Sequence, residues 1–509
     1  MAEQSTSPTI TRMPIGDIQA DYDVIIVGAG FGGIGAAIQL KRLGYDNIAI
    51  LEREAGLGGT WHVNRYPGLA VDTPATTYSY WFEPNPRWSR LFPPGEELRQ
   101  YAEDVAAKYD VRSLVKCNTT VECAHWDEDA RVWHVTLSGG KTLTARFLIT
   151  ATGFLSQPHT PQIPGIETFG GTTIHTAAWD SNHDFEGRRV ALIGTGATAV
   201  QLIPELAAKV AELTVYQRTA IHVVPKIDFA IPAWLQWVFA QLPFVHRVFR
   251  QVTDTIYDII LDGALHYRLF RRLAIAASDL SKISRFISIR DKELRRKLTP
   301  DYDFGCKRPT WSNRYYKTFA APHVHLETNR IERIEPDGIV TANGHKTVID
   351  TLVMATGFDV WETNFPAIEV IGREGRNLGK WWRESGFQSY QGVAIPYFPN
   401  YMSLVSPYGF SSLSFFNTAG YQMRHMARLF GELERKGATE FEVTEDAMAR
   451  FMDRMTGLRE KTVWHAGDCA TSRSYYFDPD GKAALLRPTN VVDAKRDASR
   501  FPLSDYVMR

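Results

Sequence analysis

The chain contains two stretches that share one pattern of hydrophobic and polar positions. Each has a short apolar run (Val24–Val27 in one, Val190–Ile193 in the other), then a glycine-rich turn, a helical stretch and a second apolar run. Continuous apolar runs bounded by turns are typical of strands buried on both faces of a parallel sheet. The pattern therefore predicts two strand–helix–strand units in a protein of the α/β class.

The first unit carries the spacing of a dinucleotide-binding turn. Gly28-x-Gly30-x-x-Gly33 directly follows the first strand, and Glu52 ends the second. The first glycine permits a tight turn, the second lets a pyrophosphate approach, and the third lets the helix pack on its strand. A carboxylate at the end of the second strand accepts hydrogen bonds from a ribose. These features predict a Rossmann-like domain, with cofactor contacts from Gly28, Gly30, Phe31, Gly32, Gly33 and Glu52.

The second unit repeats the turn, but different residues follow its second strand. Gly194-x-Gly196-x-x-Ala199 follows the strand, and Gln217-Arg218-Thr219 stands where the first unit has its acid. A carboxylate would repel a 2′-phosphate, whereas a guanidinium binds one through paired, charge-assisted hydrogen bonds. The sequence therefore favours NADPH over NADH here, unless Arg218 is only a solvated surface residue. The residues expected at this nucleotide are Gly194, Thr195, Gly196, Ala199, Gln201, Arg218 and Thr219.

Two further apolar strands end in the same tripeptide. Phe147–Thr150 leads into Ala151-Thr152-Gly153, and Thr351–Met354 leads into Ala355-Thr356-Gly357. We interpret each as a crossing between two domains, so that the NADPH-binding domain is inserted into the first one. Two dinucleotides, one of them held by the outer domain, imply a flavin plus a nicotinamide, with a hydride passing from one to the other. The expected boundaries are a tail at 1–20, an FAD-binding domain at 21–155 and 355–509, and an NADPH-binding domain at 156–354.

Composition and charge exclude several other classes of protein. The 57 Lys and Arg balance the 57 Asp and Glu, so nothing suggests a nucleic-acid partner. The polar first twenty residues indicate a loose tail and not a signal peptide. The longest apolar run, Ala230–Val245, is too short and too interrupted for a transmembrane segment.

The cysteines carry little positional information. Cys117, Cys123, Cys306 and Cys469 have neither the spacing of a metal site nor that of a disulfide framework. We therefore expect no metal, no disulfide bond and a reducing, cytoplasmic environment.

The segment between the two units resembles a family fingerprint. Phe169-x-Gly171-x-x-x-His175-x-x-x-Trp179-Asp180 matches that of the type I Baeyer–Villiger monooxygenases, a branch of the class B flavoprotein monooxygenases, and the resemblance extends over nearly the whole chain. Relatives that oxidise amine nitrogen or sulfur usually carry Tyr or Phe in place of Trp179. In the family this segment links the two domains, which implies a hinge role for Phe169, Gly171, His175 and Trp179. A plain packing role for His175 is the alternative.

Two more segments resemble those of the family. Residues 58–80 are similar to its flavin-contacting loop, although Val71 departs from the more usual Cys. Residues 306–327 are similar to the segment with the active-site arginine, which maps onto Arg308; Lys307 maps onto a lysine that helps bind the 2′-phosphate. Asp72 would hold the guanidinium as its charged partner. The FAD contacts expected in addition are Gly59, Thr60, Trp61, Asp72, Tyr78 and Val121.

The resemblance implies a reaction and leaves two rivals open. It implies that NADPH, O₂ and FAD convert a small-molecule ketone into an ester or lactone through a flavin C4a-peroxide, with Arg308 stabilising the developing anions. One rival is an N- or S-oxygenating monooxygenase, and sulfoxidation could also be a side activity. A more distant rival is a non-oxygenating flavin reductase, although the chain has no Cys-x-x-Cys motif. The ketone and the oligomeric state stay undetermined.

Two segments have no assigned chemistry. Residues 227–300 interleave aromatic and basic residues in amphipathic runs, which indicates a helical insertion over the NADPH-binding domain. A cap over the substrate channel and peripheral membrane contact are the alternatives, in that order. Residues 471–490 are rich in Tyr, Pro, Asp and Gly, which in this family indicates a lid loop.

Overall fold

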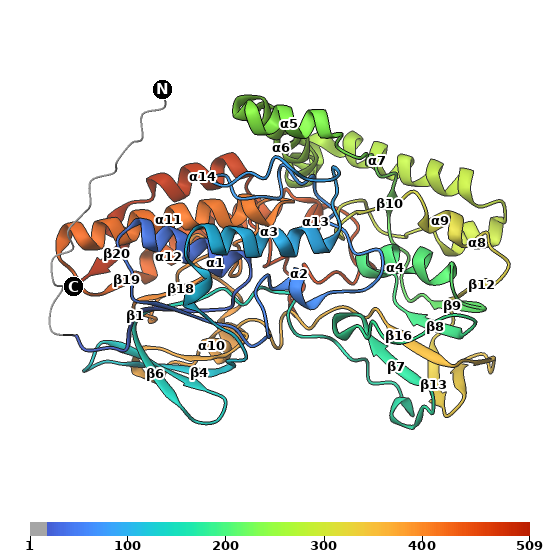
Figure 1. Ribbon diagram of the computed structural model, residues 1–509, viewed down its shortest axis with the longest axis horizontal. Coiled ribbons are helices and arrows are strands. Elements are labelled where there is room, and N and C mark those ends of the chain that lie inside the picture. The colour runs from blue at the N-terminus through green and yellow to red at the C-terminus, as the bar shows by residue number, and fades with distance from the viewer. Residues whose placement is uncertain (1–17) are drawn as a thin grey trace.

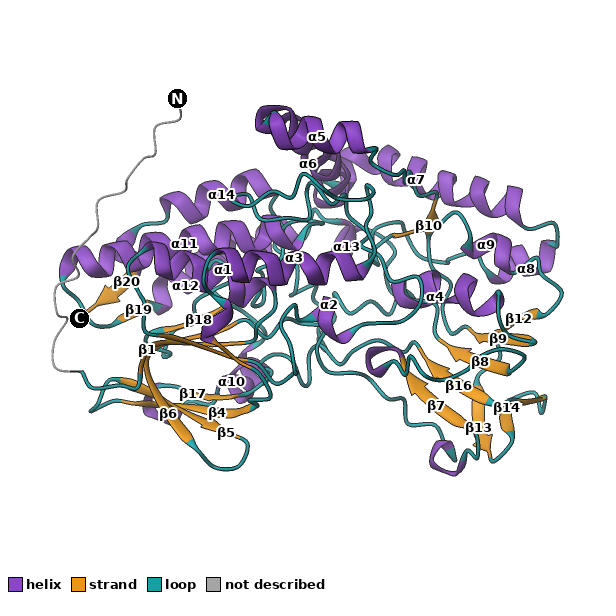
Figure 2. Ribbon diagram, viewed as in Figure 1, coloured by secondary structure: helices purple, strands orange, loops and turns teal. Residues whose placement is uncertain are grey.

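The computed structural model describes residues 18–509 (Figure 1). Two groups of strands lie at the lower left and lower right, and long helices run along the upper side (Figure 2). The expected N-terminal tail falls almost wholly outside the described residues.

The larger sheet has eight strands in the order β17-β4-β5-β6-β1-β2-β3, with β18 paired to β6. β4, β5 and β6 pair antiparallel and the other neighbours are parallel. The strands are β1 (Tyr22–Val27), β2 (Ile48–Leu51), β3 (Val115–Lys116), β4 (Val121–Asp127), β5 (Val132–Leu137), β6 (Thr142–Thr150), β17 (Glu369–Ile371) and β18 (Tyr401–Ser403).

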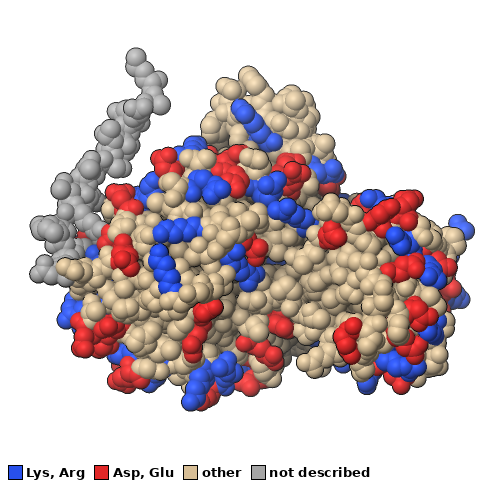
Figure 3. All heavy atoms as spheres, turned by 60° about the horizontal axis from the view of Figure 1, so that its bottom comes forward, with Lys and Arg blue, Asp and Glu red and all other residues tan. Residues whose placement is uncertain are grey.

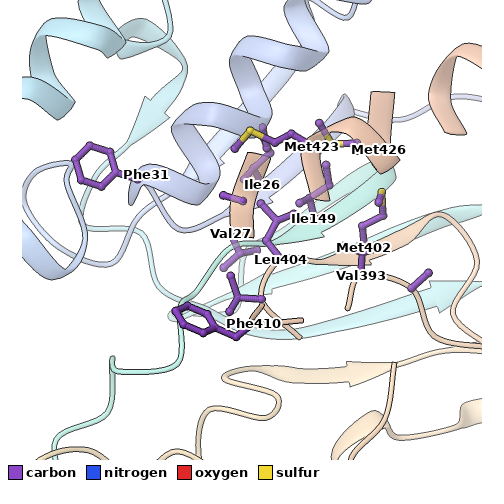
Figure 4. Packing of buried hydrophobic residues seen from close by; sticks show 14 of the residues in the cluster. Ile26, Val27, Phe31, Ile149, Val393, Met402, Leu404, Phe410, Met423 and Met426 are labelled. Carbon is purple, nitrogen blue, oxygen red and sulfur yellow. The ribbon is translucent and has the colours of Figure 1, made fainter. Parts of the chain in front are cut away.

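Buried apolar residues and one close backbone contact determine how β1 and the helix after it pack. Val24, Ile25 and Ile26 of β1 are fully buried, as expected for a strand covered on both faces. A Cβ on Gly33 would lie 1.9 Å from the carbonyl oxygen of Gly28, so α1 (Phe31–Arg42) can pack on the turn only with glycine there. Figure 4 shows the core that results, with Met423 of α11 (Phe415–Lys436) packed against residues of β1 and β6.

The second sheet has five strands, all parallel, in the order β12-β9-β8-β16-β7. They are β7 (Thr172–His175), β8 (Arg189–Ile193), β9 (Glu212–Tyr216), β12 (Val324–Glu327) and β16 (Thr351–Met354). A three-stranded antiparallel sheet and two small strand pairs add β13 (Ile331–Glu335), β14 (Gly338–Thr341), β15 (Lys346–Val348), β10 (Val223–Val224), β11 (Thr310–Trp311), β19 (Phe441–Val443) and β20 (Tyr506–Met508).

All strands of the second sheet lie between β6 and β17 in the chain. The larger sheet is therefore made from two separate parts of the sequence, and the second unit is inserted between them. This confirms the predicted α/β class with one nucleotide-binding fold inserted into another.

Residues 227–300 form the expected helical insertion. It contains α5 (Ala233–Gln241), α6 (Pro243–Leu265), α7 (Tyr267–Ser288) and α8 (Lys292–Lys297), and α5, α6 and α7 lie along the upper edge of the molecule (Figure 1). No helix in the described part of the chain is long and apolar enough to cross a bilayer. The other helices are α2 (Thr60–Val63), α3 (Gly95–Lys108), α4 (Ala197–Ala207), α9 (Tyr315–Thr318), α10 (Leu378–Ser385), α12 (Glu445–Arg459), α13 (Val463–Ala466) and α14 (Val491–Arg500).

Candidate active site

The fold brings Arg308 and Asp72 together although they are 236 residues apart. Nε and Nη2 of Arg308 donate to the two carboxylate oxygens of Asp72 at 2.7 and 2.9 Å, and Nη2 also donates to the carbonyl oxygen of Leu413 at 3.0 Å. A guanidinium has five N–H donors, so these three bonds leave the two donors of Nη1 uncommitted to Asp72 or Leu413. The pair is therefore held rigidly at one edge and can present the other to an anion.

Opposite charges keep both partners ionised. Burial alone would lower the pKa of Arg308, but the charge of Asp72 and the hydrogen bonds to it raise that pKa well above its ordinary value. Burial would likewise raise the pKa of Asp72, and Arg308 outweighs this effect and lowers it. The guanidinium thus carries a fixed positive charge at any pH where the protein is folded.

Aromatic side chains from distant segments surround this ion pair. Trp61 donates from Nε1 to the Tyr78 hydroxyl at 3.2 Å, and Tyr257 of α6 lies 3.5 Å from the backbone oxygen of Asp72. Tyr475 and Tyr476 are close enough for their pKa values to respond to Arg308, although burial dominates and raises both. The 58–80 loop, the insertion and the 471–490 loop therefore meet at Arg308.

A disulfide bond joins Cys306 to Cys469, and both residues are buried. The expectation of no disulfide bond is wrong, because the partners are 163 residues apart and only the fold makes them neighbours. Cys117 and Cys123 are free. The bond fixes the chain two residues before Arg308 to the start of the expected lid loop.

The turn after β1 has features that fit a dinucleotide. Gly30 caps α1 without a side-chain hydrogen bond, so the first N–H groups of this helix can bind a pyrophosphate. Gly59, just before Thr60 and α2, approaches within contact of Gly30, which keeps the mouth of the turn free of side chains. These residues therefore fit the diphosphate of FAD.

Glu52 lies at the end of β2, as predicted. Its carboxylate accepts from the backbone N–H of Ala29 at 2.7 Å and of Glu54 at 2.9 Å, which fixes its orientation and leaves lone pairs for a ribose. The backbone N–H of Thr119 donates to the Glu52 carbonyl oxygen at 2.8 Å, which places the chain two residues before Val121 and β4 beside Glu52.

The second glycine turn opens onto unfilled space. Gly196 caps α4 without a side-chain hydrogen bond, and a Cβ on it would meet no atom within 4 Å. Ala199 is buried in α4, and the Thr195 hydroxyl donates to the carbonyl oxygen of Thr219 at 2.7 Å. Gln201 makes a different contact: its amide donates to the carbonyl oxygen of Ala70 at 2.8 Å and so joins α4 to the 58–80 loop.

Three cations converge beside this turn. Burial and the charges of Arg218 and Arg473 lower the pKa of Lys307 to about 8, and partial desolvation and Arg473 lower the pKa of Arg218. The neighbouring positive charges add to the effect of burial in lowering these two pKa values, and a multiply charged anion would oppose both effects. The cluster therefore fits a 2′-phosphate, and it includes Arg473, which the sequence analysis did not single out.

The fingerprint segment packs against the crossing strand β16. His175 at the end of β7 pairs in register with Met354, and its Nε2 lies 3.3 Å from the hydroxyl oxygen of Thr356 in the second Ala-Thr-Gly turn. Its Nδ1 accepts from the N–H of Ala177 at 3.1 Å, and burial lowers the pKa of His175. The imidazole is thus neutral and donates from Nε2 to Thr356, which joins the fingerprint to the domain crossing.

The remaining fingerprint residues have packing contacts. A Cβ on Gly171 would lie 2.4 Å from the carbonyl oxygen of Asp350 and 2.6 Å from the Phe169 ring, so these two positions depend on each other. Trp179 stacks on Phe185 with ring centroids 5.2 Å apart.

Comparisons with known proteins agree with this geometry. Residues 25–243 match the family model described as pyridine nucleotide-disulphide oxidoreductase. A Baeyer–Villiger monooxygenase of Streptomyces coelicolor is 34% identical, with 95% of this chain and 92% of the relative covered. The chain belongs to the Baeyer–Villiger monooxygenases.

Solved structures extend the likeness to the whole fold. A closed crystal structure of cyclohexanone monooxygenase superposes with a TM-score of 0.83 at 27% identity, over 96% of this chain and 99% of that one. A crystal structure of OTEMO in complex with FAD and NADP gives a TM-score of 0.83 at 25% identity, over 96% and 100%. This Baeyer–Villiger monooxygenase is thus an oxidoreductase with FAD and NADPH as its cofactors.

Replacing His175 with alanine tests the hinge role in this monooxygenase. Loss of the bond to Thr356 should slow reduction of the flavin by NADPH by about fivefold, since one such bond contributes about 1 kcal/mol. The bound FAD should stay unchanged, because His175 lies outside the first glycine turn. Stopped-flow absorbance measures the rate, and the FAD-to-protein ratio measures the cofactor; loss of FAD would instead favour the plain packing role.

Proposed function

We propose that this monooxygenase converts a small-molecule ketone into an ester or lactone, with Arg308 and Asp72 as its catalytic pair. The observation that carries the proposal is the two-point contact between them, which leaves Nη1 of a permanently charged guanidinium for other partners. Insertion of oxygen next to a carbonyl passes through anionic oxygens, and a preorganised cation in a water-poor site stabilises such charges.

The chain's own residues then have distinct tasks. When bound, the cofactors supply hydride transfer and activation of O₂. Arg308 donates hydrogen bonds to the negative charge that develops on the substrate's oxygen. Asp72 holds the guanidinium plane in place, and the Leu413 carbonyl prevents its rotation by occupying one more donor. Tyr475 and Tyr476 are buried beside Arg308 and reduce its contact with water, which strengthens the electrostatic interactions there.

The nearest alternative is an N- or S-oxygenating monooxygenase. That chemistry transfers an electrophilic oxygen and needs no cation beside the reacting oxygens, so it gives no role to the Arg308–Asp72 pair. Sulfoxidation can still occur as a side activity. The distant alternative, a non-oxygenating flavin reductase, would consume NADPH without taking up oxygen into any product.

A product assay separates these functions. The FAD-loaded protein is given NADPH, O₂ and a panel of linear, cyclic and aromatic ketones, with a thioether in parallel, and products are analysed by gas chromatography and mass spectrometry. We expect an ester or lactone from at least one ketone. Sulfoxide or N-oxide without any ester would favour the first alternative, and NADPH oxidation without an oxygenated product would favour the second.

We further propose that Arg218, Lys307 and Arg473 together bind the 2′-phosphate of NADPH. Lys307 has a pKa of about 8 before the phosphate binds, and the phosphate should raise it. Binding therefore takes up a proton above pH 8, and affinity falls as the pH rises through that value.

This gives a pH prediction. The dissociation constant for NADP⁺ should increase by up to about tenfold per pH unit above about 8. NAD⁺ lacks the phosphate, so its weaker binding should not change over the same range. Fluorescence titration at pH 6.5 to 9.5 measures both; parallel curves for the two coenzymes would contradict the role of Lys307.

We propose residues 21–155 and 355–509 as the two parts of the FAD-binding domain. Residues 156–354, which lie between these parts, are proposed as the NADPH-binding domain. Gly28, Gly30, Gly33, Glu52 and the 58–80 loop are proposed to bind FAD. We propose a small-molecule substrate and O₂ as the partners, without nucleic acid. Sedimentation analysis measures the number of subunits in the assembly.

We also propose a cytoplasmic location, supported by the demand of the reaction for NADPH. Because of the Cys306–Cys469 bond, the cysteines no longer indicate a reducing compartment, where disulfide bonds are rare. Its burial, however, shields it from cellular thiols. In the purified protein, alkylation after unfolding should label two cysteines before reduction and four after it. Labelling of four without reduction would show that the pair is present as thiols.

A further inference from the structure

The helical insertion exposes an unusual amount of apolar surface. The part of the chain that the structure describes has 22 large hydrophobic side chains that are exposed, and 15 of them lie on α5, α6 and α7. The exposed fractions include 66% for Trp234, 63% for Trp237, 61% for Phe244 and 75% for Ile287. Single exposed hydrophobic residues are common, but a concentration of this size on one element marks an interaction surface.

The exposed residues follow helical stripes. On α6 they are Phe244, Val248, Val252, Ile256 and Ile259, at spacings of three or four residues, so they share one face of the helix. Five residues at similar helical spacing form a stripe along α7: Leu269, Leu273, Leu280, Ile283 and Ile287. Figure 3 shows the projection at the top of the molecule as mostly uncharged.

The charges around this surface are mostly positive. Between Ala233 and Ser288 the exposed charged residues include Arg247, Arg268, Arg271, Arg272 and Lys282. The four aspartates of these helices are half-buried, and the side chain of Asp279 is 49% exposed. Of those aspartates, Asp254 lies 3.6 Å from Arg250, and Asp279 pairs with Lys282 at 3.2 Å. The apolar face is thus bordered by cations, although the whole chain has a formal net charge of zero.

The opposite face of α6 is anchored to the flavin-contacting loop. Arg250 donates to the carbonyl oxygens of Ser79 and Tyr80 at 3.0 and 3.2 Å, and the Thr253 hydroxyl lies 2.9 Å from that of Thr77. The helix α6 therefore cannot rotate to bury its exposed stripe, because rotation would break these contacts.

We propose that the outer face of α5, α6 and α7 docks on the surface of an anionic lipid bilayer. An amphipathic face with tryptophan, phenylalanine and leucine, bordered by Arg and Lys, is the pattern of helices that lie in a membrane interface. The cations match lipid phosphates and anionic headgroups. A second copy of the same face is disfavoured, because an isologous contact would bring the exposed cations of both copies together, and the exposed carboxylate of Asp279 is already paired with Lys282.

Vesicle co-sedimentation with the FAD-loaded, full-length protein tests this. Vesicles of phosphatidylcholine with one third phosphatidylglycerol should bind the protein at least about tenfold more tightly than vesicles of phosphatidylcholine alone. The double variant Val248→Asp/Ile283→Asp should abolish binding, because it places charges in the apolar stripes of both helices. Arg271→Glu/Arg272→Glu should remove the preference for the anionic vesicles.

The matched control is Val348→Asp/Val507→Asp, which alters two exposed valines on β15 and β20, away from the insertion. This control should bind like the unaltered protein, and all variants should keep their FAD absorbance and unfolding temperature. Failure of the unaltered protein to bind anionic vesicles would overturn the proposal. So would a dimer in sedimentation analysis that Val248→Asp/Ile283→Asp converts to monomers, since the face would then be a subunit interface.

Discussion

Replacing Arg308 with alanine should abolish ester formation while NADPH oxidation continues. Hydride transfer needs only the two nucleotide sites and their arrangement, whereas oxygen insertion needs a cation beside the developing anion. Loss of one preorganised donor lowers a rate by about 10²–10³, and the loss of a full charge should add to this. The measurement is the amount of ester per NADPH oxidised, for a ketone that the unaltered protein accepts.

Three further variants test whether ester formation depends on the charge and the orientation of the Arg308 guanidinium. Arg308→Lys should not restore ester formation, because an ammonium cannot make the two-point contact with Asp72. Asp72→Ala should give a milder defect, because the guanidinium keeps its charge but loses its orientation. Arg314→Ala removes an exposed arginine of the same segment and should have no effect. If Arg308→Ala still couples NADPH oxidation to ester at close to the original ratio, Arg308 is not catalytic.

Replacing Arg218 or Arg473 with alanine should raise the KM for NADPH by about 10–100-fold. A hydrogen bond to a charged group contributes about 1.5–3 kcal/mol, and about 1.4 kcal/mol corresponds to a factor of ten. The KM for NADH should change by less than about threefold, because NADH has no 2′-phosphate. Initial rates of NADPH and NADH oxidation measure both constants.

Arg188→Ala serves as the matched control for these variants. Arg188 is exposed and precedes β8, so it lies at the end of the strand opposite the glycine turn. It should leave both constants unchanged. Equal loss of NADPH and NADH in the Arg218 or Arg473 variant would mean that the residue supports the fold of the domain and does not bind the phosphate.

Local patterns were sufficient to predict both nucleotide units. The strands before Gly28 and Gly194 are buried apolar runs, and the glycine spacing depends only on the turn that follows each strand. The Ala-Thr-Gly strands predicted the insertion, because a strand that ends in such a turn was expected at each crossing. Arg308 has no local pattern of its own and was found only through the resemblance of residues 306–327 to a family segment.

Contacts between distant segments could not be predicted. Arg473 lies in a loop with no periodic pattern, and only the fold places it beside Arg218 and Lys307. Leu413 contributes a backbone oxygen, which any residue has, so its sequence carries no signal of its contact with Arg308. The bond between Cys306 and Cys469 closes a separation of 163 residues, and sequence spacing gives no information about such pairs.

The most direct measurement uses ¹⁸O₂. A ketone from the panel is incubated with the FAD-loaded protein, NADPH and ¹⁸O₂ in ordinary water, and the product is analysed by mass spectrometry against the NADPH consumed. We predict an ester or lactone that carries one ¹⁸O atom, formed in proportion to NADPH oxidised. Recovery of all the consumed O₂ as hydrogen peroxide with every ketone, or an ester without ¹⁸O, would contradict Baeyer–Villiger oxygenation by this protein.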